Sequence, residues 1–189
     1  MSELPYGEIT KADEELLIRM AKEASKDGLN SVALELGTFL GRSAIILSKH
    51  MKMVYTIDVF ENVDKIPYEA SRIHYKEHLL KHPRTYQEIK ESLSEYENIH
   101  LFNGITSQKI NLIEDDTISL LFFDADHTFE GLKRAFNLCY PKLKKGGILI
   151  VHDSGKYAHW MEPILFTATL RGIMEKIDES DISTAWRKI

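Results

Sequence analysis

The strongest constraint on the fold is a glycine-bearing turn that follows a short apolar strand. Residues 33–43 read ALELGTFLGRS, so Gly37 and Gly41 lie between an expected strand at 31–36 and an expected helix at 43–51. Glycine lets the backbone turn sharply and approach a ligand closely, because it has no Cβ. The first N–H groups of the helix can bind polar ligand atoms. The turn therefore indicates a site for a nucleotide-like ligand.

The spacing of the glycines narrows the class of ligand. A dinucleotide-binding turn has three glycines in the pattern G-x-G-x-x-G. Here Thr38 stands where the middle glycine would admit a pyrophosphate. The pattern argues against NAD and favours a nucleoside ligand without phosphates.

Composition excludes several classes of protein. With 189 residues and 43% hydrophobic content, the chain fits one compact domain over residues 1–189. A net charge of -5 gives no general attraction to nucleic acid. The single cysteine, Cys139, cannot form an internal disulfide. No signal segment and no run of about 18 apolar residues is present, so we expect a cytoplasmic protein with no membrane partner.

Apolar segments alternate between strand-like and helix-like patterns. Strands are expected at 31–36, 54–57, 99–102, 118–123 and 148–151, with helices at 8–27, 43–51 and 128–143. This alternation predicts an α/β fold, a Rossmann-like doubly wound, mostly parallel sheet with helices on both faces and a core at about 30–155. A helix at 161–180 and one last strand at 182–189 would leave a shortened C-terminal strand region. A homo-oligomer could cover that edge.

The inserted helical segment at about 61–97 is long for a connection between strands. It contains two polar helical pieces, at 67–81 and 85–96, of which one is the expected crossover helix. The other is either a lid beside the strand ends, where ligands bind in such sheets, or a solvated surface helix. His74, His78 and His82 recur there at helical spacing, a pattern that can bind metal but is more typical of a solvated stripe.

Polar side chains gather at the ends of the predicted strands. They are Glu35, Asp58, Asp124 with Asp126 and His127, and His152 with Asp153. Because the carboxyl ends of parallel strands converge on one crevice, we expect these side chains to share a site. Asp58 follows the glycine turn by the interval at which a carboxylate binds ribose hydroxyls. Its alternative role is to cap the following turn.

Four segments together resemble a known family. They are Glu35-Leu-Gly-Thr-Phe-Leu-Gly-Arg-Ser43, Asp58, Phe123-Asp-Ala-Asp-His-Thr-Phe-Glu-Gly131 and Gly146-Gly-Ile-Leu-Ile-Val-His-Asp153. In this order they resemble the class I S-adenosylmethionine-dependent methyltransferases, and more narrowly the bacterial small-molecule O-methyltransferase-like branch with Asp-x-Asp-His and His-Asp motifs. The resemblance covers residues 30–155.

The resemblance implies S-adenosylmethionine as the cofactor. The implied contacts are Glu35, Gly37, Thr38, Gly41 and Ser43 for its amino-acid end, Asp58 for the ribose, Asn103, Gly104 and Ile105 for the adenine, and Asp124 near the sulfonium. The chain departs from the family at Ile105, because an acidic residue often follows the glycine there.

The resemblance also implies a possible site for a divalent cation, Mg²⁺ or Mn²⁺. Related enzymes bind a metal through an aspartate after the fourth strand and a pair of residues after the fifth, which correspond here to Asp124 and to His152 with Asp153. Oxygen ligands suit Mg²⁺, whereas a histidine favours Mn²⁺, Fe²⁺ or Zn²⁺. The alternative is that Asp124 only orients the cofactor and that His152 points into the sheet.

Methyl transfer to oxygen needs a base beside the acceptor. Asp126 and His127 are the candidates, and His127 could instead cap the helix that begins at Thr128. An aromatic cluster at Tyr157, His159, Trp160 and Met161 is expected to wall the acceptor pocket or to pack in the core. The predicted function is methyl transfer to a small-molecule hydroxyl. The alternatives are a metal-dependent hydroxylase-like member of the same fold and a catalytically silent ligand-binding or assembly domain.

Overall fold

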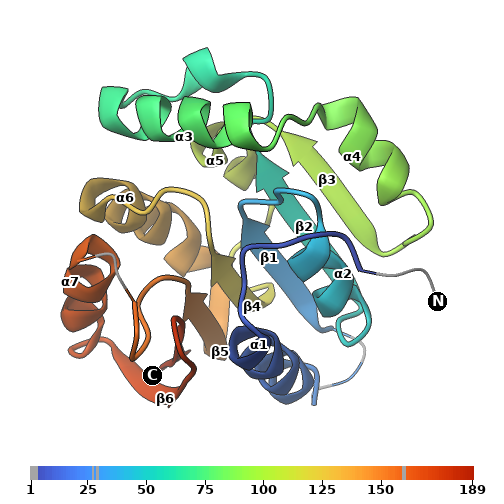
Figure 1. Cartoon of the computed structure of the whole chain (residues 1–189). Helices are drawn as coiled ribbons and strands as arrows, with labels where there is room; N and C mark the ends of the chain where they lie inside the picture. Colours follow the sequence, from blue (N-terminus) through green and yellow to red (C-terminus); the bar gives the residue numbers. More distant parts are fainter. Residues whose placement is uncertain (1–3, 27, 29, 159–160) are drawn as a thin grey trace.

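The computed structural model describes residues 4–26, 28, 30–158 and 161–189 (Figure 1). Its strands are β1 (Val32–Leu36), β2 (Met53–Asp58), β3 (Ile99–Asn103), β4 (Ile118–Phe123), β5 (Leu143–Val151), β6 (Met174–Glu179) and β7 (Thr184–Lys188). Its α-helices are α1 (Lys11–Ala24), α2 (Arg42–Ser48), α3 (Glu69–Lys81), α4 (Tyr86–Ser92), α5 (Thr106–Lys109), α6 (Phe129–Cys139) and α7 (Met161–Leu170). Three 3₁₀ turns are η1 (Val63–Lys65), η2 (Ile110–Leu112) and η3 (Tyr140–Lys142).

The seven strands form one sheet in the order β3-β2-β1-β4-β5-β7-β6. The first five pair in parallel, while β7 is antiparallel to both β5 and β6. The predicted doubly wound, mostly parallel sheet is therefore confirmed. Strand order reverses between β1 and β4, and ligands bind beyond the carboxyl ends of the strands at such a reversal.

The C-terminal region differs from the sequence prediction. The helix expected at 161–180 was wrong beyond Leu170, because Met174–Glu179 forms strand β6 and pairs with β7. These two strands are short, with six and five residues. The second C-terminal strand, which the sequence prediction lacked, is therefore present. The shortened edge no longer argues for a partner subunit, and a homo-oligomer stays a prediction.

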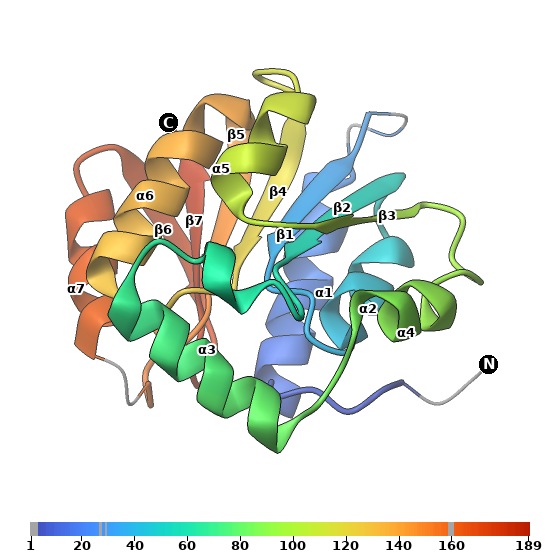
Figure 2. The ribbon, with the colours of Figure 1, turned by 90° about the horizontal axis from the view of Figure 1, so that it is seen from above.

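Alternating side chains of the sheet pack against helices on both faces. Leu120 and Phe122 lie in a cluster with residues of α1 and α2, whereas Leu121 and Phe123 lie in a cluster with residues of α6 and α7. Figure 2 shows these helix pairs on opposite sides of the sheet. None of the helices in the described part of the chain combines the length and the apolarity that a bilayer span needs.

The two helices of the inserted segment have different positions. Helix α4 packs into the fold, because Ile89 and Leu93 share a cluster with Ile45 of α2 and with Phe60. Helix α3 lies instead beyond the arrowheads of β2 and β3 (Figure 1), and Ser71 and Tyr75 line a cavity there. Helix α4 is thus the crossover helix, and α3 covers the edge where a ligand is expected.

Candidate functional site at the carboxyl edge of the sheet

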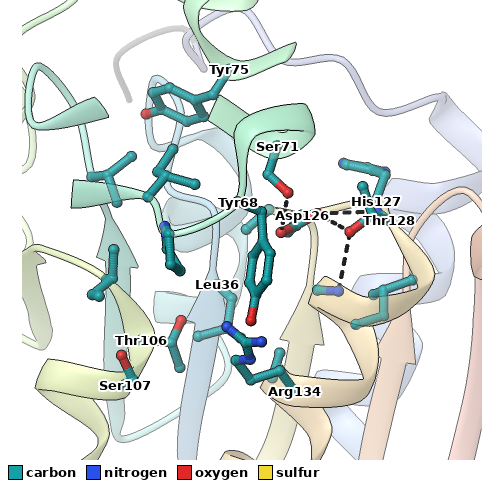
Figure 3. Close-up of a pocket in the computed structure, with 18 of the residues that line it drawn as sticks. Leu36, Tyr68, Ser71, Tyr75, Thr106, Ser107, Asp126, His127, Thr128 and Arg134 are labelled. Carbon is teal, nitrogen blue, oxygen red and sulfur yellow. Dashed lines mark hydrogen bonds between the residues drawn. The ribbon is translucent and has the colours of Figure 1, made fainter. Parts of the chain in front are cut away.

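Two adjoining cavities lie under α3. The first has a volume of about 250 Å³ and extends from Thr106 and Ser107 toward Arg134 of α6 (Figure 3). The second has a volume of about 330 Å³ and reaches from Gly37 to Asp153. Five residues line both cavities: Asp58, His74, Tyr75, Ala125 and His127. The cavities therefore offer one continuous site across the strand reversal.

Gly37 holds the glycine turn against strand β4. It has a φ of 97°, and its N–H donates to the carbonyl of Ile57 at 2.9 Å. A Cβ on Gly37 would lie 2.1 Å from the carbonyl oxygen of Asp124. Sequence reasoning required glycine here for the approach of a ligand. The structure adds a second reason: the backbone at the end of β4 leaves no room for a Cβ at this position.

Asp58 ends β2 at the border between the two cavities. Its Oδ2 accepts the N–H of Phe39 at 2.9 Å, and its Oδ1 accepts the N–H of Val59 at 2.7 Å. Oδ1 also accepts the N–H of Phe60 at 3.3 Å and the hydroxyl of Tyr75 on α3. The carboxylate therefore caps the following turn, which was the alternative prediction, and it lines both cavities. Ribose binding by Asp58 stays a prediction.

Tyr75 and Arg84 are two residues of this site that sequence reasoning missed. Arg84 is buried, and its Nη2 donates to the Tyr75 hydroxyl at 3.2 Å. Its guanidinium also lies over the ring of Phe39, 4.7 Å from the centroid. The helical pattern of residues 67–81 was visible in the sequence, but nothing there indicated which face of the helix meets Asp58.

Five of the predicted cofactor residues lie behind the cavity wall rather than on it. Gly37, Asp58, Gly104, Ile105 and Asp124 line the cavities, whereas Glu35, Thr38, Gly41, Ser43 and Asn103 are not among the lining residues. Gly41 is the N-cap of α2, with a φ of 87°. The amide of Asn103 accepts a hydrogen bond from Asn62 at 2.9 Å. These residues support the shape of the site from within the fold.

Glu35 is fully buried beneath the glycine turn. Its Oε2 accepts the hydroxyl of Thr56 at 2.5 Å, and Thr56 in turn lies 2.6 Å from the hydroxyl of Thr38. Burial raises the pKa of Glu35 to about 8, because a carboxylate without solvent is disfavoured. The three side chains therefore hold the turn against β2, with the carboxyl group of Glu35 in its neutral form.

Asp124, His127, His152 and Asp153, here called the acid-imidazole cluster, meet at the far end of the second cavity. His127 Nδ1 lies 2.7 Å from Asp153 Oδ2, and His152 Nδ1 lies 2.9 Å from Asp124 Oδ1. Burial lowers the pKa of both imidazoles, but the neighbouring carboxylates outweigh it. The net effect raises the pKa of His127 above its ordinary value and raises that of His152 to about 9.

Three members of this cluster fit a divalent cation. Donor atoms of Asp124, His127 and His152 all lie within 4.8 Å of one another. His152 is 5% exposed, and neither of its ring nitrogens makes a well-aligned hydrogen bond to the described residues. Asp124 and His152 of the predicted metal set belong to this group of three. The third predicted ligand, Asp153, lies 2.7 Å from His127 Nδ1 and 3.5 Å from His152 Nδ1, and its role as a ligand stays a prediction. Two imidazoles and one carboxylate favour Mn²⁺, Fe²⁺ or Zn²⁺ over Mg²⁺.

Asp126 joins α3 to α6. Its Oδ2 accepts the hydroxyl of Ser71 at 2.8 Å, and its Oδ1 accepts the N–H and the hydroxyl of Thr128 at 3.0 and 2.8 Å (Figure 3). A Cβ on Gly131 would lie 2.1 Å from its carboxyl carbon. Asp126 also lines the first cavity beside His127, so its predicted role as a base stays a prediction. Thr128 rather than His127 is the N-cap of α6.

The predicted aromatic cluster is described only in part. Tyr157 and Met161 are exposed, with 56% and 74% of their surface accessible. His159 and Trp160 lie outside the described residues. The described pair therefore does not pack in the core.

Comparison with known proteins supports a methyltransferase fold. Residues 34–154 match a sequence family described as a methyltransferase domain. A search of curated protein sequences gave no match.

Solved structures share the fold at low sequence identity. The O-methyltransferase NovP is 17% identical, with a TM-score of 0.73 over 94% of this chain and 79% of that one. An O-methyltransferase from Bacillus cereus in complex with SAH is 15% identical, with a TM-score of 0.61 over 98% of this chain and 84% of that one. The tRNA (m1A58) methyltransferase TrmI from Aquifex aeolicus is 13% identical, with a TM-score of 0.62 over 99% of this chain and 72% of that one. The shared fold therefore accommodates different acceptors.

Proposed function

Because the chain belongs to the methyltransferase-domain family, we propose that it transfers a methyl group from S-adenosylmethionine to a hydroxyl oxygen of a small molecule. The observation that carries the proposal is the continuity of the two cavities. They share Asp58 and His127, so a donor site and an acid-imidazole cluster open onto each other. Two sites in contact are what a direct transfer requires.

The first cavity would hold the nucleoside of the cofactor. Gly104 and Ile105 would contact the adenine, and Asp58 would bind the ribose hydroxyls. The amino-acid end would extend into the second cavity, where it would face Gly37. Glu35 and Thr38 would act from behind by fixing the glycine turn, as their burial and hydrogen bonds support. The hydroxyl of Tyr75 must leave Asp58 when the ribose arrives.

The second cavity would hold the acceptor, with His127 as its base. The bond from His127 Nδ1 to Asp153 fixes the tautomer that leaves Nε2 as the proton acceptor. Nε2 would take the hydroxyl proton while the oxygen forms its bond to the methyl carbon. When bound, S-adenosylmethionine would supply the methyl group, and its sulfur would keep the electron pair of the broken carbon–sulfur bond, which leaves S-adenosylhomocysteine.

Asp124 and His152 would hold a divalent cation beside this base. When bound, such an ion supplies positive charge that lowers the pKa of an acceptor hydroxyl. Asp126 would act at a distance from the acceptor by holding α3 on α6. A small acceptor also fits the net charge of -5, which gives no attraction to a nucleic-acid backbone.

Calorimetry with S-adenosylhomocysteine tests the cofactor part of the proposal. The wild-type protein is expected to bind it, and Asp58→Ala is expected to weaken binding at unchanged circular dichroism. Radiolabelled methyl transfer to a panel of small hydroxyl compounds then identifies the acceptor. If the wild-type protein binds neither S-adenosylmethionine nor S-adenosylhomocysteine, the proposal is wrong.

His127→Gln separates a base from a metal ligand. If His127 is the base, the variant retains metal affinity and S-adenosylhomocysteine binding but loses transfer by about 10²–10⁴-fold. Loss of metal affinity together with transfer would assign His127 to the cation instead.

The acid-imidazole cluster favours a second candidate function. Two histidines and one carboxylate with open positions are also the ligands of non-haem Fe²⁺ oxygenases, which agrees with a hydroxylase-like member of the fold. Fe²⁺-dependent uptake of O₂ in the absence of S-adenosylhomocysteine binding would select this candidate. Binding of that ligand together with methyl transfer would reject it.

A further inference from the structure

A second group of metal-binding side chains lies at the rim of the second cavity. It consists of Glu8 from the N-terminal segment and of His78 and His82 from the end of α3. His78 Nε2 lies 3.1 Å from Glu8 Oε2, and His82 Nε2 lies 3.2 Å from Glu8 Oε1. All three donor atoms lie within 4.8 Å of one another. Two imidazoles one helical turn apart thus face the two oxygens of one carboxylate.

Aromatic neighbours hold both imidazole rings in this orientation. The ring of Phe39 lies 5.0 Å from that of His78 and 5.3 Å from that of His82, between centroids. On its other side His82 stacks on Tyr6 at 5.6 Å. A preset ring orientation reduces the conformational entropy that ligand binding must overcome. The rings are therefore preorganised for a common ligand.

Charges of both signs surround the three side chains. The C-terminal end of α3 carries partial negative charge, and Glu8 supplies a full one. The opposing charges are Lys81, which also lines the second cavity, and Arg84, whose Nη2 lies 3.5 Å from His78 Nδ1. That nitrogen is the one turned away from Glu8, and Arg84 also donates to the carbonyl of His82 at 3.0 Å.

We propose that Glu8, His78 and His82 form a binding site for a divalent transition-metal ion of the Zn²⁺ class. Three protein ligands of this type leave a fourth tetrahedral position for water. The ion would fasten the N-terminal segment to α3, two parts of the chain that lie 70 residues apart. Because Phe39 packs on both histidines and its N–H binds Asp58, the ion would also fix α3 over the cavities. The site is separate from the acid-imidazole cluster and does not depend on the proposed methyl transfer.

Titration with Zn²⁺ or Co²⁺ alone tests the proposal. We expect the double variant His78→Gln/His82→Gln to bind one equivalent fewer than the wild type and to lose one tetrahedral Co²⁺ spectrum. The matched control, His50→Gln/His100→Gln, removes two histidines that line neither cavity and should keep the wild-type stoichiometry. Asp124→Asn should retain the site while it disturbs the acid-imidazole cluster.

Hydrogen exchange gives a readout that is independent of stoichiometry. Zn²⁺ should slow exchange in residues 4–10 and 78–84 of the wild type, and this protection should disappear in the double variant. Glu8→Gln is a milder second variant, because the Glu8 side chain is 49% exposed, and it should weaken the protection. Equal stoichiometry and equal protection in wild type and double variant would overturn the proposal. Since no methyl donor is present, this outcome is distinct from a failure of the proposed function.

Discussion

The hydroxyl of Tyr75 donates a hydrogen bond to the carboxylate of Asp58, at the place where a ribose is expected. The cofactor must break this bond, and a hydrogen bond to a charged carboxylate contributes about 1.5–3 kcal/mol. Tyr75→Phe should therefore bind S-adenosylhomocysteine more tightly, by roughly tenfold to a hundredfold. Calorimetry would measure the change, with Tyr140→Phe as the control at the other end of the sheet. Unchanged or weaker binding by Tyr75→Phe would show that the hydroxyl does not compete with the ligand.

Asp153 orients the proposed base, because its carboxylate lies 2.7 Å from His127 Nδ1. Asp153→Asn should lower the rate of methyl transfer by about 10–100-fold, the usual effect of losing such a partner. Binding of S-adenosylhomocysteine should stay at the wild-type level, since Asp153 contacts the base and is not one of the predicted cofactor residues.

Single-turnover transfer to an acceptor from the panel would measure the rate of Asp153→Asn. Asp181→Asn is a suitable control, because it removes a carboxylate outside both cavities. A wild-type rate in Asp153→Asn would exclude this orienting role.

The predictable part of the fold was the buried part. Strand β4 is apolar on both faces of its pleat except at Ser119, and all six of its residues are buried. Its continuous apolar run located it. Strand β6 was read as helix because Glu175, Lys176 and Asp178 break its apolar pattern. Glu175 and Lys176 are exposed on this edge strand, and Asp178 forms an ion pair with Arg19 of α1. Pairing with β7 in a hairpin and burial of Met174 stabilise the strand, but its polar residues show no alternation of apolar side chains that would predict it.

The site residues at the ends of strands could be predicted from the sequence, whereas those on α3 could not. Asp58 and Asp124 were located because they directly follow buried strands. Tyr75 was missed because the apolar residues of α3 do not share one face, and Ile73 and Leu80 are exposed. Likewise, His78 and His82 read as a solvated stripe because Glu8, which faces them, is far away in the chain.

Gly37 should tolerate a side chain much less well than another glycine with a similar backbone. Both Gly37 and Gly146 have positive φ values, 97° and 76°, so alanine at either position should cost about 1–2 kcal/mol. At Gly146 a Cβ has no neighbour within 4 Å, whereas at Gly37 it meets the backbone of Asp124. This clash should cost a further ~1–3 kcal/mol.

Urea unfolding of the two alanine variants would test the difference between the glycines. Equal losses of stability would mean that β4 can move away from the turn. If Gly37→Ala does not fold while Gly146→Ala does, the prediction of a costly clash at Gly37 is confirmed.

Glu35 should make the protein less stable as the pH rises. Its pKa is about 8 in the folded state against an ordinary 4.5, so between these values the folded protein holds a proton that the unfolded chain releases. Stability therefore falls by up to about 1.4 kcal/mol per pH unit across this window. Glu35→Gln removes this term, so its stability relative to the wild type should increase from pH 5 to pH 8.

Thermal or urea unfolding at several pH values would measure this relative stability. The stability of the control variant Glu175→Gln should change with pH in the same way as that of the wild type, because Glu175 is exposed. A constant difference between Glu35→Gln and the wild type would mean that Glu35 is ionised in the folded protein.

The contacts of α3 divide the site into a fixed half and an exchangeable half. The strand side is locked, because Gly37, Asp58 and Asp124 each serve the backbone of the sheet as well as the cavity. The α3 side meets the cavities through side chains such as Ser71 and Tyr75, which the sheet does not need for its own structure. Redesign toward a new acceptor should therefore randomise α3 and leave the strand ends intact. Divergence among natural relatives should follow the same division, with substrate range changing through the inserted segment.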